Sequence, residues 1–151
     1  MTGIDVKFWH KRSGLVTGCS GVVGGWLTKK LVAVGADVVG IVRDSVPRAL
    51  IHAAGVDRQI RIAGGNIEDV DFVTRVLNEY EIETVFHLAA QTIVGTANRH
   101  PISTFEANIG GTWTVLEASR QVKTVRRVVL ASSDKAYGNQ QQLPYGEHTP
   151  L

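Results

Sequence analysis

Three evenly spaced glycines, Gly18, Gly21 and Gly24, form the first group of residues whose pattern could do chemistry. They follow the short apolar run 14–17 and precede a segment with helical spacing of apolar residues. Glycines at such a junction permit a tight turn and let backbone amides approach a pyrophosphate at the helix N-terminus. The spacing is tighter than Gly-x-Gly-x-x-Gly, so the interpretation depends on the position between strand and helix. We expect a diphosphate site, and a simple turn is the alternative.

Arg43 and Asp44 occupy the place where a second recognition group is expected. An acidic residue about 20 positions after the glycines, at the end of the second strand, can bind the adenosine ribose, and Asp44 lies there. The neighbouring guanidinium of Arg43 suits a ribose 2′-phosphate and so favours NADP, although NAD remains open. The alternative is an exposed Arg/Asp ion pair on a loop.

The elements that must position these residues follow from the apolar pattern. Short apolar runs predict buried parallel strands over residues 14–17 and 37–42. Residues 59–63, which alternate in polarity, and residues 84–88 and 128–131 predict three more strands. Segments with helical periodicity separate most of them, and residues 48–54 predict a short helix. Strands alternating with helices predict right-handed crossovers and therefore an α/β domain with a doubly wound parallel sheet of about five strands. Residues 132–151 predict only loop.

Three longer helices are expected to bury apolar stripes. The first stripe recurs every three or four positions before Gly35 and comprises Val23, Leu27, Leu31 and Val34. The second follows Asn66, the expected N-cap, and comprises Phe72, Val73, Val76, Leu77 and Tyr80. The third helix opens at Ser103, which has capping-box spacing to Glu106. Its expected buried stripe is Phe105, Ile109, Trp113 and Leu116.

The composition excludes several classes of protein. The chain has 151 residues, 44% hydrophobic and 20% charged, with a net charge of +2, which is typical of one globular domain. So small a charge excess argues against nucleic acid as the main partner. No apolar run or leader is long enough to suggest a membrane span, and a single cysteine, Cys19, cannot form an internal disulfide. A cytoplasmic protein is expected, and the five scattered histidines predict no metal site.

Five short motifs in a fixed order resemble a known superfamily. They are Thr-Gly-Cys-Ser-Gly-Val-Val-Gly at 17–24, Gly-Asn-Ile at 65–67, His-Leu-Ala-Ala-Gln at 87–91, Asn-x-x-Gly-Thr at 108–112 and Ser-Ser-Asp-Lys-Ala-Tyr-Gly at 132–138. This order resembles the extended short-chain dehydrogenase/reductase superfamily, and within it the NAD(P)-dependent sugar-nucleotide epimerase/dehydratases. The CDP-glucose and GDP-mannose 4,6-dehydratase groups are the most similar. The resemblance implies a Rossmann-like fold in which residues 1–151 are an NAD(P)-binding domain that stops before the catalytic helix and the substrate lobe.

The resemblance also implies which residues bind the cofactor. Gly18, Gly21 and Gly24 would line the pyrophosphate within a turn that includes Ser20, Val22 and Val23. Asn66 and Ile67 would lie beside the adenine, where relatives usually have Asp in place of Asn66; an amide oxygen can still accept from the adenine amino group. Leu88, Ala89 and Ala90 would flank the ribose and nicotinamide side, and Gln91 and Asn108 would also bind the cofactor.

Catalytic roles are implied for Ser133, Asp134 and Lys135. Ser133 would hydrogen-bond the sugar C4 oxygen and help a tyrosine remove its proton while hydride leaves. Asp134 would protonate the departing C6 hydroxyl, and Lys135 would abstract the C5 proton. Most dehydratases have Glu in place of this lysine, and an amine base needs a lowered pKa to act near neutrality. The alternative for Asp134 and Lys135 is an exposed ion pair at a strand end.

The superfamily's Tyr-x-x-x-Lys pair is absent, because none of Tyr80, Tyr137 and Tyr145 has a lysine four positions later. Three hypotheses follow. The chain is a dehydratase-like fragment that keeps the cofactor site but has no turnover alone; or it is a non-catalytic dinucleotide-binding or regulatory module; or it is an active epimerase or reductase that another chain completes or that uses Tyr137. Acid and base groups at Asp134 and Lys135 favour the dehydratase among the enzymes.

The partners follow from the same reasoning. A nicotinamide dinucleotide is expected, together with a nucleoside diphosphate sugar, whereas nucleic acid and membrane are not. A fifth strand with no neighbour beyond it would leave apolar side chains facing water, as would the long helix from Ser103. We therefore expect a homodimer, closed by that edge strand or that helix.

Overall fold

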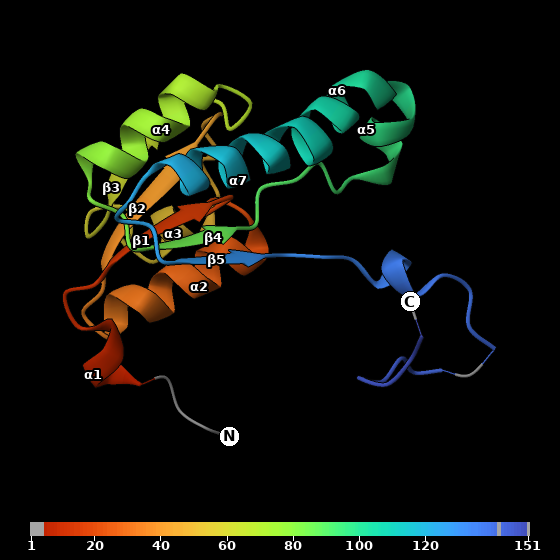
Figure 1. The fold of residues 1–151 in the computed structure, drawn as a ribbon, viewed down its shortest axis with the longest axis horizontal. Helices are drawn as coiled ribbons and strands as arrows, with labels where there is room; N and C mark the ends of the chain where they lie inside the picture. Colours follow the sequence, from red (N-terminus) through yellow and green to blue (C-terminus); the bar gives the residue numbers. More distant parts are fainter. Residues whose placement is uncertain (1–4, 142, 151) are drawn as a thin grey trace.

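The computed structural model describes residues 5–141 and 143–150 and contains one parallel sheet of five strands (Figure 1). The strands are β1 (Ser13–Thr17), β2 (Asp37–Val42), β3 (Arg61–Gly64), β4 (Thr84–His87) and β5 (Arg127–Leu130). Their spatial order is β3-β2-β1-β4-β5. The chain thus winds outward from β1 to β3 and then returns to the other side of β1. This is the doubly wound topology predicted from the sequence, with its reversal between β1 and β4.

Helices cover both faces of the sheet. Helices α2 (Val22–Ala33) and α3 (Leu50–Ala53) pack together on one face, and α4 (Val70–Glu79) and α7 (Gly111–Gln121) pack together on the other. Successive strand residues point to opposite faces. Leu15 and Val85 accordingly join the core under α4 and α7, while Val16 and Phe86 join the core under α2.

A short helix that the sequence did not predict, α1 (Val6–Trp9), closes the amino end of the sheet. The Asp5 carboxylate accepts a hydrogen bond from the Phe8 amide (3.1 Å) and caps this helix. The Trp9 ring packs on Phe86 with 5.7 Å between centroids, and the Phe8 ring lies under the guanidinium groups of Arg12 and Arg127. The segment therefore packs through aromatic side chains.

The predicted N-cap at Asn66 is wrong. Helix α4 is capped by Asp69, whose carboxylate accepts from the Phe72 amide at 3.0 Å. The side-chain Oδ1 of Asn66 accepts from the amide of Glu68 (3.4 Å) within the loop before the helix. Both residue types can cap a helix, and the carboxylate nearer to the first helical residue does so here. Strands β3 and β5 are also displaced, beginning two residues later and one residue earlier than predicted.

The long helix begins earlier than the capping box indicated. After α5 (Val94–Arg99), helix α6 (Pro101–Phe105) starts at the proline and continues through a π-helical turn, Glu106–Gly110, into α7. Proline is favoured in the first helical turn, where its missing N–H costs nothing. Ser103 is therefore already inside the helix, and its hydroxyl donates to the His100 carbonyl at 3.1 Å.

The predicted buried stripe of this helix is exposed. Its residues do share one face, but Phe105 is 60% exposed and Trp113 66% exposed, and Ile109 and Leu116 are exposed as well. The sheet is covered instead by the opposite face, through Val115 and Ala118. We call the set Phe105, Ile109, Trp113 and Leu116 the outer face. Periodicity predicted correctly that these side chains align, but it does not say which face of a helix is covered. Val23, predicted to lie in the buried stripe of the helix that is now α2, is exposed as well.

Strand β5 forms one edge of the sheet. It pairs with β4 alone among the described strands, and all four of its residues are exposed, as expected for an open edge. Beyond β5 the chain leaves the sheet and projects away from it (Figure 1). This projecting segment contains a 3-10 turn, Asp134–Tyr137, where only loop was predicted. Among the described residues no helix has the length and apolarity that crossing a membrane requires.

Candidate functional site

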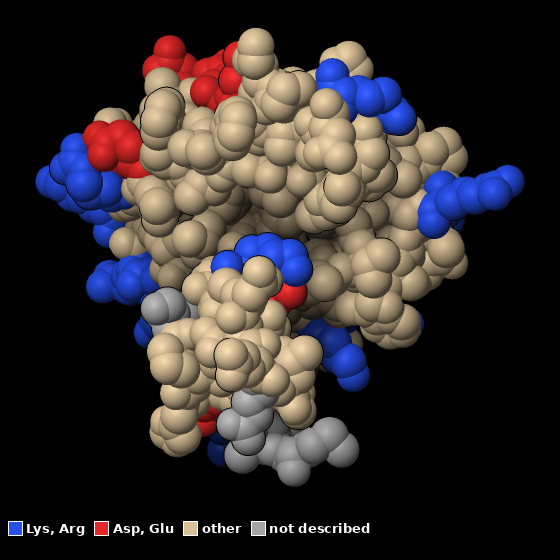
Figure 2. Space-filling view, turned by 90° about the vertical axis from the view of Figure 1, so that its right-hand side faces the viewer, with Lys and Arg blue, Asp and Glu red and all other residues tan. Residues whose placement is uncertain are grey.

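A cleft of about 430 Å³ lies at the carboxyl ends of β1, β2 and β4. Figure 2 shows a hollow in the face at this side of the molecule, with few charged side chains around it. The lining comes from the turn after β1, the end of β2, the segment after β3 and the segment after β4. The lining residues expected from the sequence are Gly18, Ser20, Gly21, Val22, Val23, Gly24, Arg43, Asp44, Asn66, Ile67, Leu88, Ala89, Ala90 and Gln91. In doubly wound sheets, ligands bind at such a reversal of strand order.

The turn between β1 and α2 requires its glycines. Gly18 has a φ of +72°, and a β-carbon there would come within 2.9 Å of the Ala89 amide nitrogen. A β-carbon on Gly24 would overlap the carbonyl group of Gly18. These two positions bring the start of α2 close to the end of β1 and to the segment after β4.

The first amides of α2 are free hydrogen-bond donors. Gly21 is the N-cap and offers no side chain, and within 5–141 and 143–150 no group accepts from the amides of Val22, Val23 or Gly24. All three residues line the cleft. Unpaired amides and the positive end of the helix dipole together favour an anion at this position. The residues present therefore fit the diphosphate expected from the sequence.

Cys19, inside the same turn, is fully buried. Its Sγ lies 3.8 Å from the Ile41 carbonyl oxygen, and a β-carbon on Gly40 would come within 2.5 Å of the sulfur. Glycine in the middle of β2 thus makes room for this side chain. Burial raises the pKa of the thiol to about 11, so Cys19 is a protonated packing group at neutral pH.

Arg43 and Asp44 lie at the end of β2 and both line the cleft. The Arg43 Nε lies 2.6 Å from Asp44 Oδ2, and the two side chains are 60% and 68% exposed. The structure thus shows the exposed ion pair that was one hypothesis for these residues. It also places them in the cleft, as the alternative hypothesis of ribose binding requires. So exposed a pair contributes little to folding stability, which leaves both groups available to a ligand.

The segment after β4 is held by a hydroxyl that the sequence analysis did not single out. Thr17 Oγ1 accepts from the amides of Leu88 and Ala89 (3.1 Å each) and lies 2.8 Å from His87 Nδ1. The other ring nitrogen, His87 Nε2, lies 3.1 Å from Thr112 Oγ1. Burial lowers the pKa of His87. The sequence signal for this contact is that two neighbouring buried strands, β1 and β4, each end in a polar residue, Thr17 and His87.

Asn108 supports the cleft rather than lining it. Its side-chain oxygen accepts from the Gln91 amide (2.7 Å), and its Nδ2 donates to the Gln91 carbonyl (3.1 Å). Asn108 lies in the π-helical turn, a distortion often found at functional sites. The expected cofactor-binding residue therefore acts on Gln91, which does line the cleft.

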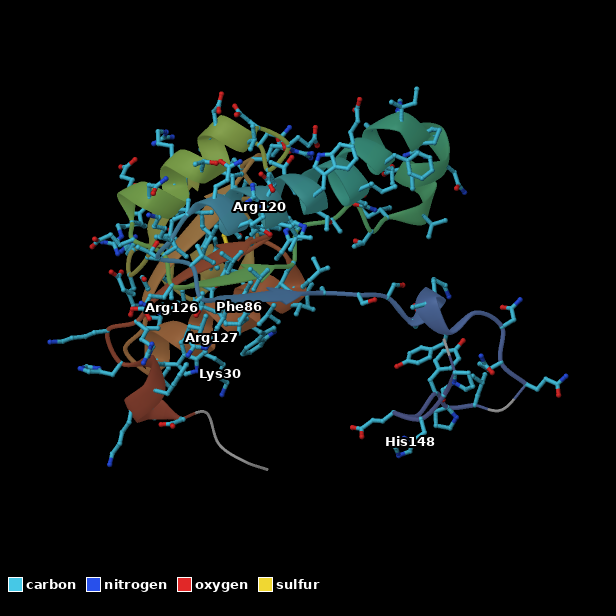
Figure 3. All side chains as sticks on the ribbon, in the orientation of Figure 1. Lys30, Phe86, Arg120, Arg126, Arg127 and His148 are labelled. Carbon is cyan, nitrogen blue, oxygen red and sulfur yellow. The ribbon has the colours of Figure 1, made fainter. Side chains whose placement is uncertain are left out.

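Ser133, Asp134 and Lys135 are not part of the cleft. All three are exposed and absent from the cleft lining. They belong to the segment after β5, and Figure 3 shows His148 of the same segment lying far from the sheet. Lys135 Nζ lies 3.1 Å from Asp134 Oδ2, and Ser133 donates to the other carboxylate oxygen at 3.2 Å. Hydrogen bonds from Lys135 and Ser133 hold the pKa of Asp134 below its ordinary value. The structure thus shows the exposed ion pair. Among the described residues no cluster of His, Cys, Asp or Glu could hold a metal.

The sheet order, the glycine turn and the position of the cleft define a Rossmann-like α/β domain. The model of the GDP-mannose 4,6-dehydratase family matches residues 15–151, and the chain belongs to this family. It is 34% identical over 151 residues to a CDP-glucose 4,6-dehydratase of Salmonella typhimurium, covering 98% of this chain and 42% of that protein. It is also 34% identical over 135 residues to a UDP-glucose 4-epimerase of Lacticaseibacillus casei, covering 89% and 39%.

Solved structures of epimerases share the fold. The UDP-glucose-4-epimerase of Stenotrophomonas maltophila, with bound NAD and formylated UDP-arabinopyranose, has a TM-score of 0.79 at 28% identity, covering 93% of this chain and 42% of that one. The enzyme from Bifidobacterium longum in complex with NAD+ and UDP has a TM-score of 0.78 at 27% identity, covering 91% and 42%. The chain thus spans about two fifths of the length of these relatives.

Proposed function

We propose that this chain is the NAD(P)-binding portion of a nucleotide-sugar epimerase/dehydratase. The observation that supports this most strongly is the set of free amides at Val22, Val23 and Gly24, three residues that line a cleft at the reversal of strand order. Two structural neighbours carry NAD in a fold of the same kind. In this proposal the diphosphate accepts hydrogen bonds at the start of α2, and Asn66 and Ile67 flank the adenine.

The ribose end of the cleft bears on the choice of dinucleotide. The Asp44 carboxylate can accept from ribose hydroxyls, and the Arg43 guanidinium can bind a 2′-phosphate. Because Arg43 is exposed and lines the cleft, we propose that NADP is accepted at least as well as NAD. A 2′-phosphate would compete with Asp44 for the same guanidinium.

Within the family we propose a sugar-nucleotide 4,6-dehydratase rather than an epimerase. The bound nicotinamide would supply a hydride acceptor for C4 of the sugar. Ser133 would bond the C4 oxygen, and Asp134 and Lys135 would serve as acid and base for loss of water across C5 and C6. These residues must then approach the cleft from the projecting segment. Because the 151 residues hold no Tyr-x-x-x-Lys pair, we expect this polypeptide to bind a dinucleotide without turning over a sugar nucleotide.

We further propose that two copies associate through the outer face. The side chains of Phe105, Ile109, Trp113 and Leu116 are large, apolar and exposed on one side of a continuous helix. A contiguous apolar surface of this kind favours association.

Titration calorimetry with NAD+ and NADP+ tests the cofactor proposal. The 151-residue chain should bind at least one of them with a Kd well below about 1 mM. Gly21→Ala should weaken that binding about tenfold, because it places a methyl group in the cleft where the diphosphate is proposed to lie. The backbone of Gly21 is extended, as alanine allows, and the new β-carbon would lie 3.2 Å from the Gly18 carbonyl oxygen. Gly64→Ala is the matched control, because its β-carbon would meet nothing within 4 Å. Failure to bind either dinucleotide, or unchanged binding by Gly21→Ala, would contradict the proposal.

A separate measurement tests the expected lack of turnover. Mixing the chain with NAD+ or NADP+ and a nucleoside diphosphate sugar should give no reduced nicotinamide on the timescale of a single turnover. Formation of reduced nicotinamide with CDP-glucose or UDP-glucose would favour the active enzyme, and Tyr137→Phe would then show whether Tyr137 provides the base.

A further inference from the structure

A series of hydrogen bonds, buried at Thr17 and half-buried at Thr112, runs from β1 to the π-helical turn. It passes from Thr17 on β1 through His87 on β4 to Thr112 at the start of α7. Thr17 is fully buried and His87 is 2% exposed. Neither Thr17, His87 nor Thr112 lines the cleft, so these residues act on a ligand only through what they hold.

The hydrogen-bond inventory of Thr17 fixes the protonation of His87. A hydroxyl has two acceptor lone pairs and one hydrogen to donate. Thr17 Oγ1 already accepts from the amides of Leu88 and Ala89, so its hydrogen is the one that occupies the 2.8 Å contact to His87 Nδ1. Nδ1 is therefore the unprotonated nitrogen, and a neutral imidazole carries its proton on Nε2.

At Thr112, the other end of this series of hydrogen bonds, an acceptor is available for the proton on His87 Nε2. The Thr112 hydroxyl donates to the Asn108 carbonyl at 2.7 Å, which leaves its oxygen free to accept from His87 Nε2–H at 3.1 Å. Asn108 in turn bonds both backbone groups of Gln91. The donors and acceptors from Thr17 to Thr112 thus match, and the path joins the two ends of the segment 88–91.

We propose that His87, as the neutral Nε2–H tautomer, is a positioning residue that couples the glycine-turn strand to the π-helical turn and so fixes the segment 88–91 beside the bound dinucleotide. This inference rests on the proposed cofactor site. Leu88 and Ala89 are held by Thr17, and Gln91 is held by Asn108. His87 is the group that makes these two anchors one network.

An apolar side chain could fill the same space but could not do this. It would leave the hydroxyl hydrogen of Thr17, which is fully buried, without an acceptor, and an unpaired buried polar group is costly. It would also remove the donor that Thr112 Oγ1 accepts from. A histidine protonated on both nitrogens would also fail, because its Nδ1–H would face an oxygen whose lone pairs are already used. The arrangement therefore specifies both the residue and its tautomer.

The first experiment reads the tautomer directly. Nitrogen-15 NMR of the 151-residue chain at neutral pH should show His87 with a protonated Nε2 and a bare Nδ1. This signature does not depend on any dinucleotide. A His87 signal typical of the Nδ1–H tautomer or of the imidazolium would overturn the inference whether or not the cofactor site is correct.

The second experiment breaks the network at Thr112. Thr112→Val removes the hydroxyl with little change of shape, Thr112→Ser keeps it, and Thr114→Val alters a buried threonine of the same helix outside this network. Thr112→Val should speed hydrogen exchange of the Gln91 amide and weaken binding of the preferred dinucleotide by about threefold to tenfold. Thr112→Ser should restore both, and Thr114→Val should change neither.

The outcomes separate the two proposals. If the unmodified chain binds neither NAD+ nor NADP+, the proposed function fails, and the tautomer and the Gln91 exchange rate still decide the role of His87. If the chain binds a dinucleotide but Thr112→Val leaves both the exchange rate and the Kd unchanged, the positioning role of His87 is overturned and the cofactor site stands.

Discussion

Gly24 and Gly18 touch backbone to backbone, so closely that a β-carbon on Gly24 would overlap the Gly18 carbonyl group. This contact sets the distance between the first turn of α2 and the end of β1. It therefore determines where the free amides of Val22, Val23 and Gly24 lie in the cleft. A backbone carbonyl cannot rotate away as a flexible side chain can.

Gly24→Ala should consequently destabilise the fold. We expect the free energy of unfolding to fall by about 1–3 kcal/mol, the usual cost of forcing a methyl group into a packed site. Urea unfolding followed by circular dichroism measures this. Gly64→Ala, whose β-carbon meets open space, should change the value by no more than about 0.5 kcal/mol. Equal effects of the two substitutions would show that the contact is not rigid.

Arg43 and Asp44 should affect the two dinucleotides in opposite directions. Arg43→Ala should weaken NADP+ binding about tenfold or more relative to NAD+, because a charge-assisted bond to the 2′-phosphate is lost. Asp44→Ala should weaken NAD+ binding more than NADP+ binding, because its carboxylate would accept from the ribose hydroxyls.

Titration calorimetry with both ligands gives the two ratios. The control is Arg75→Ala, which removes another guanidinium that is 60% exposed and ion-paired, in this case with Glu79 on α4. An Arg43→Ala variant with the same NADP+ to NAD+ ratio as the unmodified chain would show that Arg43 makes no contact with the 2′-phosphate.

His87 should make stability fall at mildly acidic pH. Its folded-state pKa is lowered by burial, so below about pH 6.5 the unfolded chain binds a proton that the folded chain does not. The free energy of unfolding should therefore decrease as pH falls from about 6.5, until the folded-state pKa is reached. The lowered pKa values of Asp57, Asp134 and Glu117 place their contributions at lower pH.

Urea unfolding at a series of pH values from neutral to mildly acidic measures this slope. In His87→Gln the free energy of unfolding should depend less on pH, because the contribution of His87 is gone. The other histidines are present in both proteins, so their contributions cancel when the two curves are compared. Parallel curves for the two proteins would contradict a neutral, buried His87.

The outer face should govern the oligomeric state. We expect analytical ultracentrifugation at micromolar concentrations to show a dimer, and Trp113→Arg should shift it to monomer by placing a charge in the centre of that face. Val6→Arg alters an exposed apolar residue on α1, at the far end of the sheet, and should leave the dimer unchanged. An unmodified chain that is monomeric at these concentrations would contradict the proposed dimer.

The strands and the cleft-lining turn could be predicted from the sequence because their physical signals are local. A buried parallel strand such as β2 is a short run rich in apolar β-branched residues, and the glycines at 18, 21 and 24 permit a turn that few other residues allow. Asp69 could not be told from Asn66 as the cap of α4, because both types cap helices and only the backbone path decides.

Features that depend on distant partners could not be predicted. The outer face has the apolar spacing of a buried stripe, and only the packed structure shows that the described chain leaves it uncovered. The link between Thr17 and Thr112 joins positions nearly a hundred residues apart through His87, and no local pattern indicates it. Asn108 was found by resemblance, but its partner Gln91 became apparent only from the geometry.

The sequestered sulfur of Cys19 gives this polypeptide a built-in reporter. Because the chain has one cysteine and its thiol is both inaccessible and protonated, a thiol-reactive dye can label it only when the glycine turn opens. The labelling rate under native conditions therefore measures how often the glycine turn opens, with no engineered probe. Any small molecule that seats on the turn should slow the reaction in proportion to its occupancy.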